Sequence, residues 1–181
     1  KIMSSEGVLT LGQGRVAFFH ETFFDYCFAR HFIASGAKLR DLLRRSEQDL
    51  FRRSQVRQIL TFERGADVAA YLDDLAWLLT SPDVRLHLKA LVVALLETVQ
   101  DPTVEEWQLL RPLACDQLSP LHLHAWQAVR RNSAWFSILD AEGIWEKLLR
   151  TGGELAHRAV WALSAFAPGN PKRVITLLKG S

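Results

Sequence analysis

The stretch that decides the fold is His87-Leu-Lys-Ala-Leu-Val-Val-Ala94, because two later stretches of the chain align with it. They are His122-Leu-His-Ala-Trp-Gln-Ala-Val129 and His157-Arg-Ala-Val-Trp-Ala-Leu-Ser164, and the three leading histidines are 35 residues apart. A second segment with bulky apolar anchors follows each copy at a variable distance. Helix pairs that recur every roughly 35–45 residues are typical of α-solenoids. The sequence therefore predicts stacked helix pairs, and an irregular helical bundle is the alternative.

The first copy also resembles a known type of repeat, because Asp83-Val84-Arg85 before an Ala/Leu-rich helix is similar to the start of the inner helix of a HEAT-type repeat. Helical periodicity extends over most of the chain, with Gly36 and Gly65 as predicted ends and Asp67 as a predicted N-cap. We expect helices over residues 20–35, 38–45, 48–64, 68–79, 84–99, 104–115, 121–131, 133–139, 142–150, 154–166 and 171–179.

The first twenty residues follow a different pattern. Residues 7–11 and 15–19 are short β-type runs, and Gly12-Gln13-Gly14 between them is a turn signal, so the pattern predicts a β-hairpin. A lone hairpin is marginally stable, and the helix predicted from His20 to Ser35 is apolar on nearly every side. We therefore expect an exposed apolar patch here that a neighbouring domain covers.

Composition excludes several classes of protein. The 181 residues are 49% hydrophobic and 23% charged, with a net charge of +2, which is typical of a globular domain and not of a disordered tail. Two cysteines, Cys27 and Cys115, cannot form a disulfide framework, which favours a cytoplasmic location. The longest apolar run, residues 90–96, is too short to span a membrane. Because the chain begins at Lys1 and not at Met, we expect it to be part of a longer protein.

The sharpest local motif is Phe18-Phe-His-Glu-Thr-Phe-Phe-Asp-Tyr-Cys-Phe-Ala29, at the junction of the predicted hairpin and the apolar helix. It resembles the winged-helix segment of NACHT-type STAND ATPases, which are nucleotide-switched signalling proteins. The residues that match the pattern of that family are Phe18, His20, Thr22, Phe23, Asp25, Tyr26 and Ala29. Phe24 and Phe28 depart from it, because the family usually has a polar residue and an alanine there. A looser similarity to the helical region of large bacterial NACHT-like proteins extends from Leu50 to Leu113.

The resemblance implies a role for His20, because the histidine of the family motif contacts the phosphates of bound ADP and helps to hold the closed state. An imidazole N–H next to a helix N-terminus is chemically suited to a phosphate oxygen. The alternative is that His20 only anchors the junction of hairpin and helix. This chain lacks the Gly-x-x-x-x-Gly-Lys-Ser/Thr loop that cradles phosphates. The resemblance therefore implies that ATP or ADP binds an ATPase domain encoded upstream, and that no cofactor binds here.

Other chemistry is weakly supported by the sequence. Residues 38–64 contain eight Lys or Arg against four Asp or Glu, but the pattern lacks the aromatic interleaving that single-strand binders use, so it favours a solvated helix face over nucleic-acid binding. His122 and His124 point to different sides of a helix, which disfavours a metal site. The adjacent Asp73 and Asp74 are interpreted as solvated. We predict no catalytic residue and no metal ligand.

These observations give one leading prediction and one alternative. The chain is expected to be a non-catalytic regulatory part of a STAND ATPase, with the end of a winged-helix element at 1–36, a helical linker at 37–80 and HEAT-like repeats at 81–181. Its expected partners are the upstream ATPase domain in cis and a protein or ligand on the repeat surface. The alternative is a stand-alone α-helical repeat scaffold for protein–protein interaction.

Overall fold

The computed structural model describes residues 9–12, 15–18 and 21–180 of the chain, and this part is mostly α-helical. Two short strands, β1 (Leu9–Gly12) and β2 (Arg15–Phe18), pair antiparallel, with Leu9 opposite Phe18 and Gly12 opposite Arg15. The middle of the predicted turn lies outside the described residues, as does His20. No described helix has the length and apolar character needed to cross a membrane.

The chain divides into two compact units, Lys1–Leu88 and Lys89–Ser181. The predicted division at 1–36, 37–80 and 81–181 stays a prediction. The two compact units are defined by contacts between residues, which do not identify a segment as a winged helix, a linker or a repeat. The helices that begin in the first unit are α2 (Glu21–Ala34), α3 (Leu39–Arg45), α4 (Arg52–Ala66), α5 (Val68–Thr80) and α6 (Leu86–Leu96), the last of which contains the boundary.

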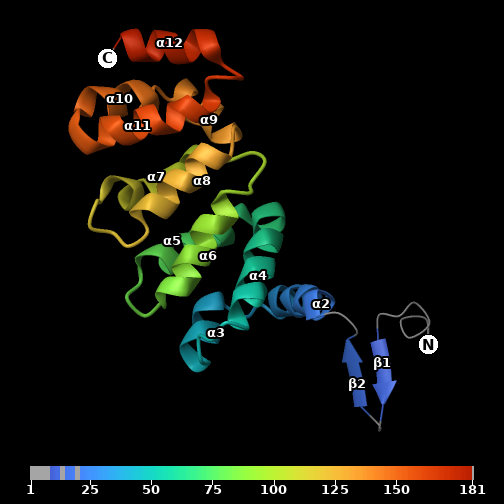
Figure 1. The fold of residues 1–181 in the computed structure, drawn as a ribbon. Helices are drawn as coiled ribbons and strands as arrows, with labels where there is room; N and C mark the ends of the chain where they lie inside the picture. The colour runs from blue at the N-terminus through green and yellow to red at the C-terminus, as the bar shows by residue number, and fades with distance from the viewer. Residues whose placement is uncertain (1–8, 13–14, 19–20, 181) are drawn as a thin grey trace. The chain divides into compact units, whose positions relative to one another are not determined.

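In the first unit, α4 packs against both α2 and α5 (Figure 1). The side chains that α4 buries include Val56, Ile59, Leu60 and Glu63, which recur at the spacing of one helix face. Beside α4, α3 packs on α5 and buries Leu39 and Leu43. The core of this unit is thus built from short apolar stripes on several helices.

Helix ends in this unit confirm two predicted signals and correct a third. Gly36 follows α2 with a φ of 70°, a conformation that glycine adopts without strain, and the Asp67 side chain accepts a hydrogen bond from the Ala70 N–H at 3.1 Å. Gly65, however, does not end α4. The helix continues to Ala66 because the backbone hydrogen bonds persist, and the N–H of Asp67 still donates to the Glu63 carbonyl.

The start of α4 is also later than predicted, at Arg52 instead of Gln48. Gln48 is buried in the loop between α3 and α4, where its amide donates to the Asp83 carbonyl at 2.8 Å and accepts from the Arg85 N–H at 2.9 Å. These bonds fasten the α3–α4 loop to the segment before α6. The amide therefore has partners in this loop that it would lose within a helix.

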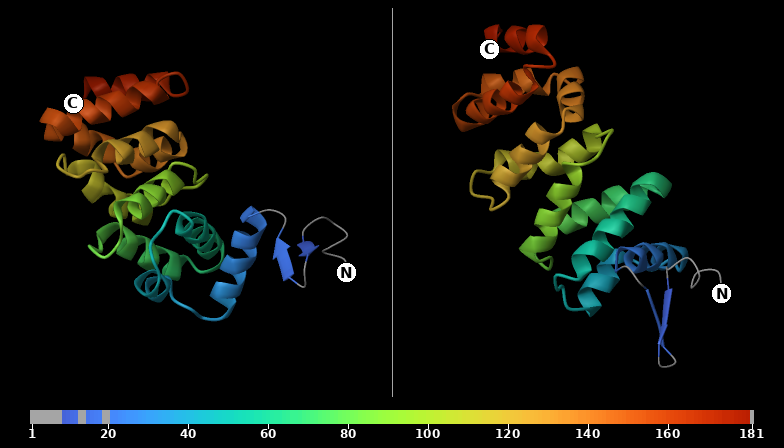
Figure 2. Two further views of the ribbon diagram at one scale, coloured as in Figure 1. Left: turned by 60° about the horizontal axis from the view of Figure 1, so that its bottom comes forward. Right: turned by 45° about the vertical axis from the view of Figure 1, so that its right-hand side comes forward.

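The second unit contains six further helices in its described part, and it is built in layers. They are α7 (Val104–Cys115), α8 (His122–Arg131), α9 (Ala134–Ala141), α10 (Ile144–Thr151), α11 (Gly153–Phe166) and α12 (Pro171–Lys179). Within this unit α7 packs beside α8, α8 beside α11, α11 beside α10, and α12 against α10 and α11 (Figure 1 and Figure 2). Thr103 and Glu106 form a capping box that starts α7, as acidic residues in the first turn favour.

Buried tryptophans hold these layers together. The indole N–H of Trp126 donates to the Ala114 carbonyl at 2.9 Å, and the indole N–H of Trp135 donates to the Leu96 carbonyl at 3.1 Å. Both carbonyls lie in the last turn of a helix, where backbone acceptors have no partner within the helix. Trp126 and Trp135 are both fully buried, and each donates a hydrogen bond that satisfies a helix terminus.

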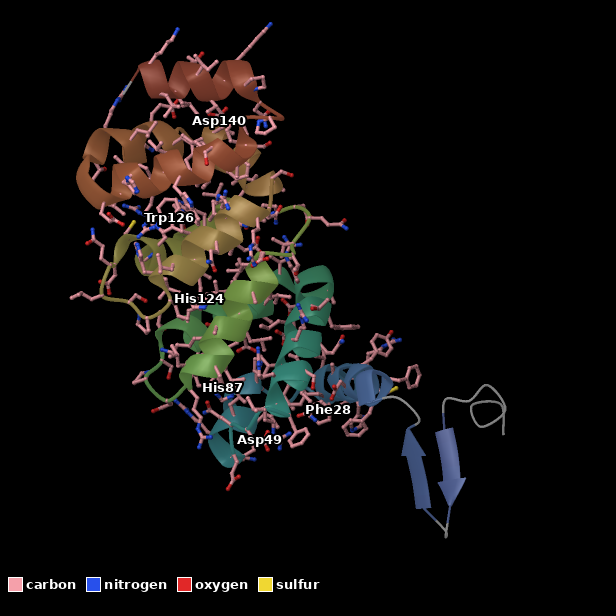
Figure 3. All side chains as sticks on the ribbon, viewed as in Figure 1. Phe28, Asp49, His87, His124, Trp126 and Asp140 are labelled. Atoms are coloured by element: carbon pink, nitrogen blue, oxygen red, sulfur yellow. The ribbon has the colours of Figure 1, made fainter. Side chains whose placement is uncertain are left out.

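Several polar links join residues that are 33 positions apart. Asn132 donates to the Val99 carbonyl at 2.6 Å, and Arg173 donates to the Asp140 carboxylate at 2.9 Å, in both cases across 33 residues. In the first unit Arg40 donates to the Asp73 carbonyl, also across 33 residues. Figure 3 labels Asp140 on α9, below α12. The spacing of these links is slightly shorter than the 35 residues that separate the three histidines.

The three aligned histidines have different surroundings. His122 is buried, His87 is half-buried and His157 is exposed. The histidine alignment therefore does not mark equivalent positions in the structure. The buried faces of α8 and α11 show why, since Ala125 and Ala159, which are both fully buried, are 34 residues apart. The layers repeat, but corresponding residues are 33 or 34 positions apart and not 35 as in the histidine alignment.

Candidate functional site: an aromatic helix face and a helix-lined groove

The motif that resembles the NACHT family continues into α2, and its residues lie on two faces of that helix. Asp25, Ala29 and Phe32 are buried, and their spacing of four and three residues places them on the face toward α4. Phe24 and Tyr26 are 43% and 44% exposed. Two aromatic side chains of α2 are thus partly exposed, and the expected apolar patch over hairpin and helix stays a prediction.

Phe28, which departs from the family pattern, is part of a row of aromatic rings along α2. Its ring stacks on Phe32 with centroids 5.9 Å apart and lies 6.3 Å from the ring of Phe24. The row runs from an exposed ring to a buried one, so the larger side chain at this position extends the apolar surface. Cys27 on the same helix is a free thiol.

A pocket of about 400 Å³ opens between α2 and α4. Arg30 lies in it with its guanidinium carbon 5.9 Å from the ring centroids of both Tyr26 and Phe62, and it donates a hydrogen bond to the Tyr26 hydroxyl at 3.3 Å. Cation–π contacts of this kind hold an arginine over aromatic faces. The residues that line the pocket are Tyr26, Ala29, Arg30, Gln58, Thr61, Phe62, Gly65 and Ala66.

Sequence reasoning missed a buried carboxyl group at the α4–α5 contact. The Glu63 side chain on α4 is buried, and its Oε2 has no hydrogen-bond partner among the described residues. Burial, together with the negative charges of Asp74 and Asp67, raises the pKa of Glu63 to about 7, while the charge of Lys38 opposes this shift. Glu63 is therefore a carboxyl group that exchanges its proton near neutral pH.

The adjacent Asp73 and Asp74 differ, which corrects the prediction that both are solvated. Asp73 is exposed and pairs with Arg40 at 2.6 Å, whereas Asp74 is 7% exposed and lies 3.8 Å from the Arg40 Nε. Burial raises the pKa of Asp74, and Arg40 partly offsets this effect. The two residues point in different directions on α5, so one of them faces the core.

Part of the basic stretch at residues 38–64 is engaged within the protein. Arg40 pairs with Asp73, Arg44 lies 3.8 Å from Asp83, and both guanidinium groups lie over the ring of Trp77. Each cation that is paired in this way offers less charge to an external polyanion. The arrangement is consistent with the interpretation of this stretch as a helix face.

The second unit contains a groove of about 410 Å³ between α7, α10 and the start of α11. Its floor is apolar and its rim carries polar and charged side chains. One stripe of α7 and one stripe of α10 supply most of the lining, because the positions recur at helical spacing. The lining residues are Val104, Trp107, Gln108, Arg111, Cys115, Glu142, Ile144, Lys147, Leu148, Thr151 and Leu155.

The candidate metal ligands of the described ranges are His, Cys, Asp and Glu side chains. Among those residues no group of three or more His, Cys, Asp or Glu side chains could hold a metal ion. His122 and His124 diverge as predicted, since His122 is buried and His124 is exposed on α8 (Figure 3). The proposed phosphate contact at His20 lies outside the described residues and stays a prediction.

Comparison of the chain with protein-family models, with curated proteins and with solved structures finds no match.

Proposed function

We propose that the chain is the non-catalytic regulatory part of a nucleotide-switched STAND ATPase of NACHT type. In this proposal, residues 1–36 are the end of a winged-helix element, residues 37–80 are a helical linker, and residues 81–181 are HEAT-like repeats. The protein would act in the cytoplasm, and ATP or ADP would bind an ATPase domain in the same polypeptide. The motif of residues 18–29 resembles the winged-helix motif of that family. The aromatic face of α2 is the structural observation that supports the proposal.

The argument from α2 is that its motif residues divide between a core face and an open face. Asp25 and Ala29 are buried toward α4, so α2 is anchored to another helix of the same unit. Tyr26 is 44% exposed on this helix, so an aromatic side chain of the motif can contact a further domain. An ATPase domain that packs here in cis would couple its nucleotide state to α4 and to the helices beyond.

His20 directly precedes α2 in the sequence. A donor at this place has the N-terminal partial charge of the helix behind it, which favours a phosphate oxygen. We propose that His20 contacts the phosphates of ADP only when the ATPase domain is present. Because α2 is fixed on α4, loss of that contact would be transmitted as a movement of the helix and not of a loop alone.

The test uses the protein at its full natural length, purified without added nucleotide. Acid release followed by chromatography measures the ADP that remains bound. We expect His20→Ala to lose most of the retained ADP, and the control His31→Ala, an exposed histidine at the other end of α2, to keep it. Equal retention in His20→Ala and the parent protein would assign His20 a purely structural role.

The alternative is a stand-alone helical-repeat scaffold for protein–protein interaction, which the layered second unit and its groove favour. The two proposals differ in what the full-length sequence must contain. A phosphate-binding Gly-x-x-x-x-Gly-Lys-Ser/Thr loop upstream is required by the first. A full-length protein without such a loop, and without bound nucleotide, would leave the scaffold as the function.

A further inference from the structure

The groove between α7 and α10 has the shape and charge of a protein-interaction site. We propose that it binds an acidic amphipathic helix of a partner protein, with apolar side chains on the groove floor and carboxylates against Arg111 and Lys147. This inference deepens the proposed function, because it rests on the repeats being the part that receives a partner.

The groove floor would take the apolar face of such a helix. Along α7, Val104, Trp107 and Arg111 recur at intervals of three and four residues, so they share one side of that helix. On α10, Ile144 and Leu148 do the same. The α7 stripe ends at Cys115, and eleven residues of helix rise about 16 Å, which matches about three turns of a bound helix.

The charges of the groove select the partner. Arg111 and Lys147 are exposed, and neither forms an ion pair with a carboxylate in the described part of the chain. Lys147 donates only to the backbone carbonyl of Glu142, at 3.4 Å. The Glu142 side chain is the third charged group of the lining, which leaves an excess of one positive charge. Carboxylates that flank an apolar stripe complement this arrangement.

The cations of the groove have no carboxylate partner in the described part of the chain, whereas three arginines elsewhere in the unit are engaged. Arg173 is held by Asp140 and Glu146, Arg158 pairs with Glu154 at 2.7 Å, and Arg130 lies over the ring of Trp161 at 4.6 Å. Arg111 and Lys147 differ from the other cations without an ion pair in that they line a groove with apolar side chains.

Three synthetic peptides of about three helical turns provide the test. They share a leucine stripe and carry Glu, Gln or Lys on its flanks, with a fluorescein label for anisotropy. At physiological salt we expect the Glu peptide to bind the full chain roughly tenfold or more tightly than the Lys peptide, with the Gln peptide between them. Equal binding of the three peptides, or binding of none at millimolar concentration, would overturn the proposal.

A charge-reversed variant locates the site. The double change Arg111→Glu with Lys147→Glu is expected to invert the preference, so that the Lys peptide binds more tightly than the Glu peptide. The control Arg53→Glu with Arg57→Glu alters the net charge equally at exposed positions of α4 and should leave the preference unchanged. Circular dichroism checks that the variants fold, and Arg111→Gln with Lys147→Gln replaces the reversed pair if it does not.

Cys115 reports occupancy because it lines the groove and is a free thiol. In a Cys27→Ser background it is the remaining cysteine, and its alkylation by iodoacetamide should slow at saturating Glu peptide. An unchanged rate would place the peptide elsewhere and overturn the assignment. Two other results would also overturn the assignment. One is a dimer of this chain that the charge-reversed variant dissociates, and the other is a nucleic-acid oligomer that displaces the Glu peptide. The ADP-retention assay is independent, so either proposal can fail alone.

Discussion

The indole N–H of Trp135 in α9 donates a hydrogen bond to the carbonyl oxygen of Leu96, the last residue of α6, at 3.1 Å. The two residues are 39 positions apart, and both are fully buried. The last backbone carbonyls of a buried helix need hydrogen-bond donors from outside that helix. Trp135 provides that partner, so one side chain fills the space between layers and completes the hydrogen bonding of α6.

Replacing Trp135 by Phe should separate these two roles, because Phe retains an aromatic ring but has no donor. We expect the free energy of unfolding to fall more than for Trp107→Phe, by about 1–2 kcal/mol, since the Leu96 carbonyl is left buried without a partner. Trp107 is a matched control because it is similarly buried, and its indole N–H donates no hydrogen bond within the described part of the chain. Urea unfolding measures both variants, and equal losses would show that only ring volume matters.

Glu63→Gln should change stability in a pH-dependent way. The pKa of Glu63 is raised from 4.5 in the unfolded chain to about 7 in the fold. The folded state therefore disfavours the ionised carboxylate. This penalty is absent below about pH 4.5, grows between the two values and is complete above pH 7.

The Glu63→Gln protein should accordingly be more stable than the parent at pH 8, by on the order of 3 kcal/mol, and equal to it near pH 4. Urea unfolding at several pH values tests this, with Glu47→Gln, an exposed position, as the control that stays flat. A stability difference that does not vary with pH would contradict the assigned pKa.

Arg173→Met should loosen α12 without unfolding the rest of the second unit. The guanidinium of Arg173 donates to both Asp140 oxygens at 2.9 Å and to Glu146 at 2.6 Å, and these bonds raise the pKa of Arg173. Bidentate pairs of this kind fix geometry as well as charge. Amide hydrogen exchange should accelerate in residues 171–179 and stay slow in α8. The neighbouring exposed Lys172→Met should change neither region, and a uniform acceleration in both helices would refute this local role.

His122→Leu is expected to stabilise the protein. His122 is 5% exposed, and neither ring nitrogen has a hydrogen-bond partner among the described residues, so folding leaves two polar atoms dehydrated. Removing them should raise the free energy of unfolding by about 1 kcal/mol. His124→Leu, an exposed change two residues away, should stay within about 0.5 kcal/mol of the parent. A loss of stability in His122→Leu would reveal a partner for the ring, such as a buried water.

Local signals in the sequence predicted the helices well where the deciding interactions are local. Thr103 and Glu106 are three residues apart and cap α7 from within its first turn, and Gly36 ends α2 through its own backbone conformation. Gly65 failed as a stop signal because a glycine permits a helix end but does not impose one. The helix α4 that contains Gly65 packs against both α2 and α5.

Local sequence signals could not predict interactions between residues that are far apart along the chain. The position of Gln48 depends on Asp83 and Arg85, and the burial of Glu63 depends on α5, so neither could be read from the neighbouring residues. The groove illustrates the same limit. The stripe on α7 was visible as helical periodicity, but its pairing with α10 follows from how the layers stack.

The links between residues 33 positions apart constrain how the chain could change in length. Deleting one residue between Val99 and Asn132 would rotate the following helix by about 100° and carry the Asn132 amide away from its acceptor. Duplicating a whole layer would instead supply each new donor with a new acceptor at the same spacing. The second unit is thus built to grow or shrink by complete layers, and to resist insertions of intermediate size.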